Sequence, residues 1–169
     1  MKLISDEYRK QNELLHKSRT KYGQRGHRHI PVITEIIEDH DCATVLDYGC
    51  GTGELVKKAP FEVNSYDPAI SRYAQLPKPA DLVVCTDVLE HIEPELLDNV
   101  LKHLKDLTLK VGYFVIATRP DTSKSLPDGS NPHKIIQKPH WWKSVLSNYF
   151  TVYQFRAKIG ECECIVLKR

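Results

Sequence analysis

The sequence has 169 residues, of which 41% are hydrophobic, and this length suits one domain with a sizeable buried core. Its 24 basic and 22 acidic residues nearly cancel to a formal charge of +2, which excludes a strongly basic nucleic-acid binder but leaves a local basic patch open. No run of about 18 apolar residues occurs and the N-terminus is polar, so we expect neither a membrane span nor a secretory signal.

The five cysteines form no C-x-x-C pair. This pattern makes a structural zinc site or a disulfide framework improbable, and it fits a protein of the reducing cytoplasm. Cys162 and Cys164 are two residues apart in an expected strand, so they share one face.

Two helices are expected in the N-terminal part. Residues 3–17 form a polar helical pattern, and Pro31 opens a second helix whose apolar stripe consists of Val32, Ile33, Ile36 and Ile37. Between them, residues 21–29 form a basic loop interrupted by glycines. This loop is placed either to close over a ligand or simply to carry solvated charges.

Strands and helices alternate in the rest of the chain. Strands are expected at residues 43–49, 62–68, 80–87, 111–120, 151–158 and 161–169, and helices at residues 54–60, 93–107 and 139–150. This alternation is typical of an α/β fold with a parallel sheet. Ligands in such folds bind beyond the carboxyl ends of the strands, which here are Asp47, Asp67, Asp87 and Thr118.

A glycine-rich turn, Gly49-Cys50-Gly51-Thr52-Gly53, follows the first of these strands. A dinucleotide fingerprint needs its third glycine where Glu54 stands, and a P-loop would end in Gly-Lys-Ser/Thr. Asp47 and Glu54 flank the turn and would repel a pyrophosphate. Asp67 lies 18 residues after Gly49, at the distance where a carboxylate accepts ribose hydroxyls. These features favour a nucleoside with a cationic tail.

The segment VLDYGCGTG, residues 45–53, resembles motif I of the class I S-adenosylmethionine-dependent methyltransferases. LVVCTDVLEHI, residues 82–92, resembles their fourth strand and the loop after it. The resemblance covers about residues 40–120 and is nearest to small bacterial or phage-type members of the ubiquinone-methyltransferase-like branch. It implies a Rossmann-like, doubly wound α/β sheet, mostly parallel with an antiparallel C-terminal strand.

The same resemblance implies a single methyltransferase domain over residues 1–169, with a helical lid at residues 1–39 and the Rossmann-like core at residues 40–169. Only 13 residues separate Asp67 from Asp81, where the family usually places a helix, a strand and a further loop. We therefore expect either a sheet that is one strand short or an adenine site that is more open than usual.

The resemblance also implies the residues that bind S-adenosylmethionine. Asp47 would order the methionyl ammonium, Asp67 would accept the ribose hydroxyls, and the glycines would let the backbone touch the cofactor. Pro68 and Ala69 would flank the adenine. The expected cofactor-binding residues are Asp47, Gly49, Cys50, Gly51, Gly53, Asp67, Pro68 and Asp87.

Asp87, Glu90 and His91 are the candidate catalytic residues, because positions i, i+3 and i+4 of a helical turn share a face. His91 would serve as a general base, or the trio would bind a hard divalent ion such as Mg²⁺. Similar segments bind metal in the ubiquinone-pathway O-methyltransferases and in small-RNA 3′-terminal 2′-O-methyltransferases, whose later histidine would correspond to His133 or His140. Alternatively, Glu90 only caps the following helix and His91 only packs.

The favoured function is therefore S-adenosylmethionine-dependent methyl transfer to a hydroxyl or amine of a small molecule or terminal group. One alternative is a cofactor-binding partner subunit without turnover. Another is an RNA-end 2′-O-methyltransferase, for which the basic residues at 19–29 and Tyr22 offer weak support. The loop at residues 118–138 is expected to form the substrate wall. The sequence specifies neither the methyl acceptor nor the oligomeric state.

Overall fold

The computed structural model describes residues 1–18, 26–122 and 125–169. Its helices are α1 (Asp6–Ser18), α2 (Ile30–Asp39), α3 (Glu54–Lys58), α4 (Leu97–Leu107) and α5 (Pro139–Ser147), and its strands are β1 (Val45–Tyr48), β2 (Asn64–Tyr66), β3 (Ala80–Thr86), β4 (Thr108–Ala117), β5 (Thr151–Lys158) and β6 (Glu161–Leu167). Short 3-10 helices are η1 (Gly26–His29), η2 (Ser71–Tyr73), η3 (Leu89–His91) and η4 (Pro94–Leu96).

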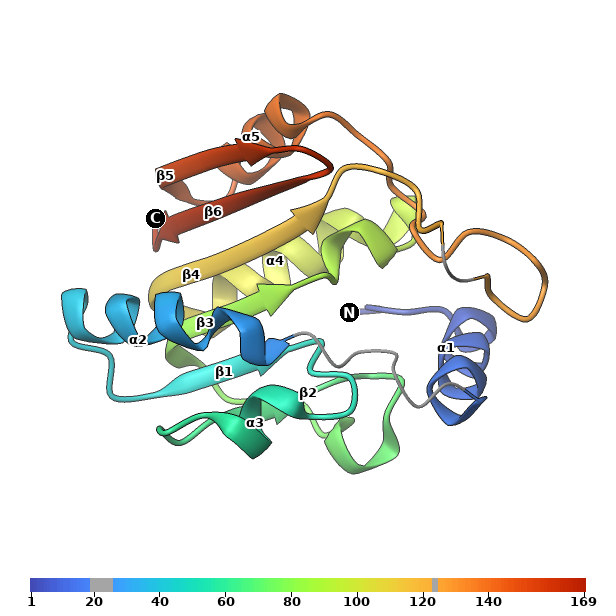
Figure 1. Ribbon diagram of the computed structural model, residues 1–169, viewed down its shortest axis with the longest axis horizontal. Coiled ribbons are helices and arrows are strands. Elements are labelled where there is room, and N and C mark those ends of the chain that lie inside the picture. The colour runs from blue at the N-terminus through green and yellow to red at the C-terminus, as the bar shows by residue number, and fades with distance from the viewer. Residues whose placement is uncertain (19–25, 123–124) are drawn as a thin grey trace.

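The strands form one six-stranded sheet in the order β2-β1-β3-β4-β6-β5 (Figure 1). Strands β2, β1, β3 and β4 are parallel, whereas β6 runs antiparallel to both β4 and β5. The predicted Rossmann-like architecture is therefore confirmed. Between Asp67 and Ala80 the described chain forms only η2, so β2 is the edge of the sheet at the place where the short segment predicted a missing strand.

Helices cover the two faces of the sheet (Figure 1). On one face α4 and α5 pack against the sheet in a core that includes Leu101, Trp142 and Phe114. On the other face α2 contributes Ile33 and Ile36, which pack against alternate residues of β1, β3 and β4. The central parallel strands are buried on both sides because helices cover both faces, which explains why they read as continuous apolar runs.

Two helix boundaries differ from the sequence expectation for local reasons. The first helix begins at Asp6 because the Ser5 hydroxyl accepts a hydrogen bond from the Tyr8 amide at 3.1 Å, as an N-cap does. The expected helix over residues 93–107 divides into η4 and α4. It is followed at once by β4, whose first residue, Thr108, donates its hydroxyl to the Leu104 carbonyl at 2.7 Å.

The N-terminal segment divides into parts with different surroundings. Although it lies within residues 1–39, α2 belongs to the packed layers of the sheet. In contrast, α1 forms a small separate cluster in which Tyr8 and Leu15 contact Leu126 of the loop after β4. Residues 21–25 of the expected basic loop, with Tyr22, lie outside the described residues. Among the helices that the structure describes, none is long and apolar enough to cross a membrane.

Candidate functional site

A cavity of about 500 Å³ lies beyond the carboxyl ends of the parallel strands. Its wall includes the predicted strand-end acids Asp47, Asp67 and Asp87, the turn residues Gly49, Cys50 and Gly51, and Pro68 and Ala69. Helix α1 and the loop after β4 close the cavity from the side, through Tyr8 and His133. The volume is in the ordinary range for a site that holds a small organic ligand.

Two residues of the glycine turn, Gly49 and Gly53, occupy positions where a side chain would not fit. Gly49 has a φ of 78°, and a Cβ placed there would lie 2.4 Å from the Val88 side chain, which itself lines the cavity. Gly53 has a φ of 76°, and its Cβ would lie 2.4 Å from the Tyr73 hydroxyl. Glycine is thus required at both positions for different reasons. Gly49 makes room for Val88 at the cavity wall, whereas Gly53, which does not line the cavity, makes room for Tyr73 of η2.

Asp67 ties the glycine turn to the segment after β2. Its side chain is buried, and its two carboxylate oxygens accept hydrogen bonds from the amides of Gly51 at 3.0 Å and Ala69 at 2.9 Å. A carboxylate oxygen can accept more than one hydrogen bond, so these contacts orient Asp67 without exhausting its capacity. Asp67 therefore presents a fixed acceptor at the cavity wall.

Asp47 is a buried carboxylate at the end of β1. Burial, with a contribution from the charge of Asp67, raises its pKa to about 7. The described residues provide Asp47 with no ion-pair partner. A cation that enters the cavity would stabilise the charged form of such a buried, unpaired carboxylate. Asp47 and Asp67 together make this part of the wall unsuitable for a pyrophosphate.

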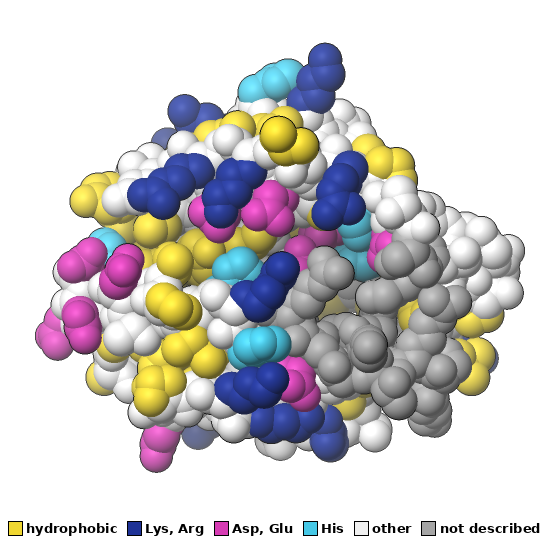
Figure 2. Space-filling model, viewed as in Figure 1, with side chains coloured by type: hydrophobic (Ala, Val, Ile, Leu, Met, Phe, Trp, Pro, Cys, Tyr) yellow, Lys and Arg dark blue, Asp and Glu magenta, His cyan; other side chains and the backbone are white. Residues whose placement is uncertain are grey.

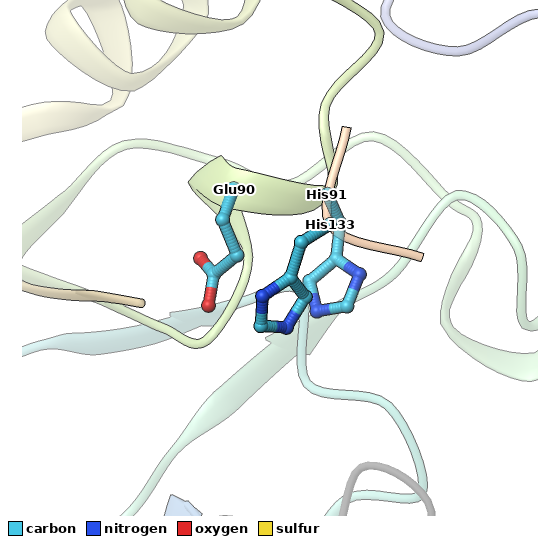
Figure 3. A group of neighbouring side chains, drawn as sticks. All are labelled: Glu90, His91 and His133. Carbon is cyan, nitrogen blue, oxygen red and sulfur yellow. The ribbon is translucent and has the colours of Figure 1, made fainter. Parts of the chain in front are cut away.

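Glu90, His91 and His133 form a polar cluster at the other end of the cavity. Each offers one ligand atom, and these atoms all lie within 4.8 Å of one another. Figure 3 shows the three side chains directed toward a common space, two from the η3 turn and one from the loop after β4. The rings of His91 and His133 meet edge to face, with centroids 4.7 Å apart. These residues lie up to 43 positions apart in the sequence, and the fold brings them together.

Glu90 is completely buried within this cluster. Its Oε1 accepts a hydrogen bond from the Ala117 amide at 3.1 Å, whereas its Oε2 is buried without a partner among the described residues. Burial, together with the nearby charge of Asp87, raises the pKa of Glu90 to about 8. Burying a carboxylate oxygen without a hydrogen-bond partner destabilises the charged form, which a bound proton or a cation would stabilise.

Both histidines have one ring nitrogen directed at a backbone carbonyl. The Nδ1 atom of His91 lies 3.0 Å from the Pro132 carbonyl oxygen, and that of His133 lies 2.6 Å from the Arg119 carbonyl oxygen. Because a carbonyl only accepts, each Nδ1 donates a proton to it, and in the neutral ring Nε2 is then the nitrogen that can act as a ligand. Metal-binding histidines commonly have this arrangement.

The loop that carries His133 is held against η3 by its backbone. The amides of Lys134 and Ile135 both donate to the Glu90 carbonyl, at 2.7 and 3.0 Å. The Oδ1 atom of Asn131 accepts from the His133 amide at 2.9 Å, and its Nδ2 donates to the Asp121 carbonyl at 2.8 Å. These contacts hold residues 131–135 against η3, where His133 lines the cavity.

The structure does not bring every expected site residue into this cluster. Asp87 lines the cavity, but it precedes η3 with a φ of 56° and is not part of the group that could share an ion. The expected helical face over residues 87–91 is therefore wrong, because the turn there is a short 3-10 helix. His140 is the second residue of α5 and does not join the cluster, so of the two candidate histidines only His133 lies beside Glu90 and His91.

Two arginines of the cavity wall were not singled out as site residues by the sequence. Arg28 belongs to η1, whose Gly26 lies against α3, with its Cβ position 3.6 Å from Leu55. Arg119 follows β4 next to the polar cluster. The one signal in the sequence was the position of Arg119 directly after a strand end, where ligands of parallel sheets bind.

The family described as "Methyltransferase domain" matches the sequence over residues 10–157. No curated protein matches it. The family assignment therefore comes from the domain match, which spans most of the chain.

Solved structures share the fold at low sequence identity. The structure of a DhpI–SAH complex has a TM-score of 0.66 and 14% identity, covering 96% of this chain and 98% of that chain. Burkholderia thailandensis 1,6-didemethyltoxoflavin-N1-methyltransferase, solved with 1,6-didemethyltoxoflavin and S-adenosylhomocysteine, has a TM-score of 0.64 and 15% identity, covering 99% and 92%. An O-methyltransferase family protein from the same organism has a TM-score of 0.55 and 15% identity over 83% of this chain, which spans 57% of that protein.

Proposed function

The chain belongs to the family described as "Methyltransferase domain", and on this premise we propose that it uses S-adenosylmethionine to methylate a hydroxyl or amine of a small molecule. The observation that carries the proposal is the cavity of about 500 Å³, in which the glycine turn and the polar cluster line one space. A structural neighbour with the same fold was solved with a small molecule, 1,6-didemethyltoxoflavin, and S-adenosylhomocysteine.

The glycine turn and Asp67 would hold the nucleoside part of the cofactor. Gly49 lines the cavity, and the absence of a Cβ there lets Val88, another lining residue, pack directly against the turn. Asp67, already oriented by two backbone amides, would accept the ribose hydroxyls. Pro68 and Ala69 continue the wall and would flank the adenine. The short segment before β3 leaves this side with only η2, which supports a relatively open adenine site.

The amino-acid end of the cofactor carries both an ammonium and a carboxylate. Asp47 supplies the buried negative charge for the ammonium. Arg28 supplies a cation on the same side of the cavity, because η1 packs against the helix that follows the glycine turn. A buried carboxylate facing an ammonium forms a charge-assisted hydrogen bond, which is stronger than a neutral one.

The charge of Asp47 makes cofactor binding depend on pH. Its raised pKa of about 7 means that the protonated form predominates below this value, where the attraction for the ammonium is lost. Calorimetric titration should therefore show that S-adenosylhomocysteine binds about tenfold more weakly at pH 6 than at pH 8. In Asp47→Asn the affinity should be low at both values, whereas Asp81→Asn, which changes an acid outside the cavity, should behave like the wild type. Equal affinity at pH 6 and pH 8 would refute this role of Asp47.

The polar cluster fits a divalent transition ion. Two imidazole nitrogens and one carboxylate oxygen are donors that suit ions such as Mn²⁺ or Zn²⁺, whereas Mg²⁺ prefers oxygen throughout. The predicted Mg²⁺ therefore does not suit the donors that the structure brings together. The partnerless Oε2 of Glu90 and the carbonyl-bound Nδ1 atoms of both histidines favour an ion held by Glu90, His91 and His133. When bound, such an ion would lower the pKa of an acceptor hydroxyl.

The chain itself mainly has to align the acceptor and exclude water. S-adenosylmethionine supplies a methyl group on a good leaving group, so little further activation is needed at the donor. Tyr8 and His133 close the cavity from α1 and from the loop after β4. Holding the acceptor in line with the methyl group removes much of the entropic cost of the reaction. His91 lies at the acceptor end, where a proton must leave an oxygen or nitrogen nucleophile.

Turnover with a defined acceptor pool tests this function. The protein with S-adenosylmethionine and Mn²⁺ should form S-adenosylhomocysteine when hydroxylated and amino-substituted small molecules are added, in excess of the rate without them. A parallel incubation with short RNA ends should remain at the background rate. Product formation with RNA alone would contradict the proposed small-molecule acceptor and would favour RNA-end methylation.

A further inference from the structure

The Arg119 side chain packs against the turn between β5 and β6, and Arg119 also lines the cavity. In the chain, Arg119 follows β4. A Cβ at position 160 would lie 2.5 Å from the Arg119 Nε and 2.6 Å from its Cδ. Gly160, with a φ of 78°, therefore makes room for this arginine, and the Thr118 amide ties the same turn to β4 by donating to the Gly160 carbonyl at 2.9 Å.

The backbone of Arg119 is joined to the polar cluster. Its carbonyl oxygen lies 2.6 Å from the Nδ1 of His133, which meets His91 edge to face. Because Arg119 also lines the cavity, an anion bound by its guanidinium would share this cavity with the proposed site of methyl transfer. Arg28, by contrast, extends from η1 on the side of the glycine turn.

The positive charge of Arg119 is not balanced within the part of the chain that the structure describes. None of the ion pairs there includes it. Glu161, the acid that follows Gly160, is paired with Lys158 at 3.8 Å, and Lys158 also pairs with Glu163. Figure 2 shows basic side chains beside acidic ones over the β5–β6 hairpin. One lysine is thus shared by the two glutamates of the hairpin, and neither glutamate forms an ion pair with Arg119 in the part of the chain that the structure describes.

Resting on the proposed function, we propose that the methyl acceptor carries an anionic group, a carboxylate or a phosphate ester, which Arg119 binds beside the hydroxyl or amine that is methylated. A guanidinium offers two parallel N–H donors that match either group, and such bidentate contacts position a ligand as well as attract it. This geometry assigns the two cavity arginines different partners: Arg28 the carboxylate of the cofactor and Arg119 the anion of the acceptor.

Calorimetric titration of the S-adenosylhomocysteine-bound protein tests the proposal with simple probes. Benzoate and phenyl phosphate represent the two possible anionic groups, and benzamide is the neutral analogue of benzoate. At least one anion should bind saturably and at least roughly tenfold more tightly than benzamide. Arg119→Gln should weaken that anion by about tenfold, whereas Arg156→Gln, which changes an exposed arginine on β5 outside the cavity, should leave it unchanged.

The result with each anion has a defined meaning. Binding of benzoate alone identifies a carboxylate, binding of phenyl phosphate alone identifies a phosphate ester, and either supports the proposal. Absence of saturable binding by both anions, or binding that is equal in the wild type and Arg119→Gln, overturns it. The affinity for S-adenosylhomocysteine is measured first in every variant and should be unaffected by Arg119→Gln. Failure of the wild type to bind S-adenosylhomocysteine would refute the assignment of the cofactor site, whereas failure of the anions alone would refute only the role of Arg119.

Discussion

Replacement of Asp67 by alanine is expected to abolish measurable binding of S-adenosylhomocysteine, with a loss of about 100-fold or more in affinity. The side chain is buried, and it performs two tasks in the same place. It would accept the ribose hydroxyls, and it fixes the wall of the site by accepting the amides of Gly51 and Ala69. Alanine removes both contributions and leaves two backbone amides without their acceptor, which is costly in a buried setting. Calorimetric titration measures the effect directly.

Asp67→Asn separates the two tasks. An asparagine retains one side-chain acceptor for a backbone amide but loses the negative charge, so the turn should remain folded while affinity falls by about tenfold. The matched control is Asp81→Asn. Asp81 also accepts two backbone amides, those of Ala43 at 2.8 Å and Thr44 at 3.3 Å, but it does not line the cavity. If Asp67→Asn and Asp81→Asn had the same cofactor affinity, the ribose-binding role of Asp67 would be wrong.

Loss of any member of the polar cluster is expected to lower turnover far more than cofactor affinity. Glu90→Gln, His91→Ala and His133→Ala should each reduce kcat by about 100-fold or more, because they remove either an ion ligand or the group that takes up the acceptor proton. Binding of S-adenosylhomocysteine should change by less than about threefold, since the glycine turn and Asp67 are untouched. His140→Ala, which changes a histidine of α5 outside the cluster, is the control.

Metal dependence can be read independently of turnover. Titration of Mn²⁺ into the chelator-treated protein, followed by electron paramagnetic resonance, should show a site that disappears in Glu90→Gln and in His133→Ala and persists in His140→Ala. Unchanged activity after complete removal of divalent ions would contradict a metal role for the cluster. In that case a loss of activity in His91→Ala would assign this histidine the role of general base.

Much of the fold could be predicted because its determinants are local. The apolar runs at 80–87 and 111–120 indicated buried parallel strands, and the structure places β3 and β4 there. The turn after β1 could be read from the spacing of Gly49, Gly51 and Gly53 alone, because each residue adopts a positive φ that only glycine accepts readily. The separate role of Gly53, which makes room for Tyr73, required the contact with η2.

The site residues at the ends of the strands could be predicted from the sequence. The cluster of Glu90, His91 and His133 could not, because it forms where two loops meet. Asp47, Asp67 and Asp87 could be named because parallel strands direct their carboxyl ends to one edge of the sheet. In contrast, spacing indicated a helical face that joined Asp87 to Glu90 and His91, whereas the chain forms a 3-10 turn that leaves Asp87 outside the cluster. The spacing of polar residues cannot show that the α-helix begins only at Leu97, after Asp87, Glu90 and His91.

The sequence by itself determined the alternating α/β order, the glycine turn and the acids at the strand ends, since periodicity and spacing act over a few residues. Only the tertiary structure decided that His133 rather than His140 joins Glu90 and His91, because that choice depends on the hydrogen bonds that hold Lys134 and Ile135 to the Glu90 carbonyl. It likewise placed Arg119 over Gly160, a contact across 41 residues of chain. Such pairings arise from the closure of long loops on a finished sheet, and no local pattern in the sequence encodes them.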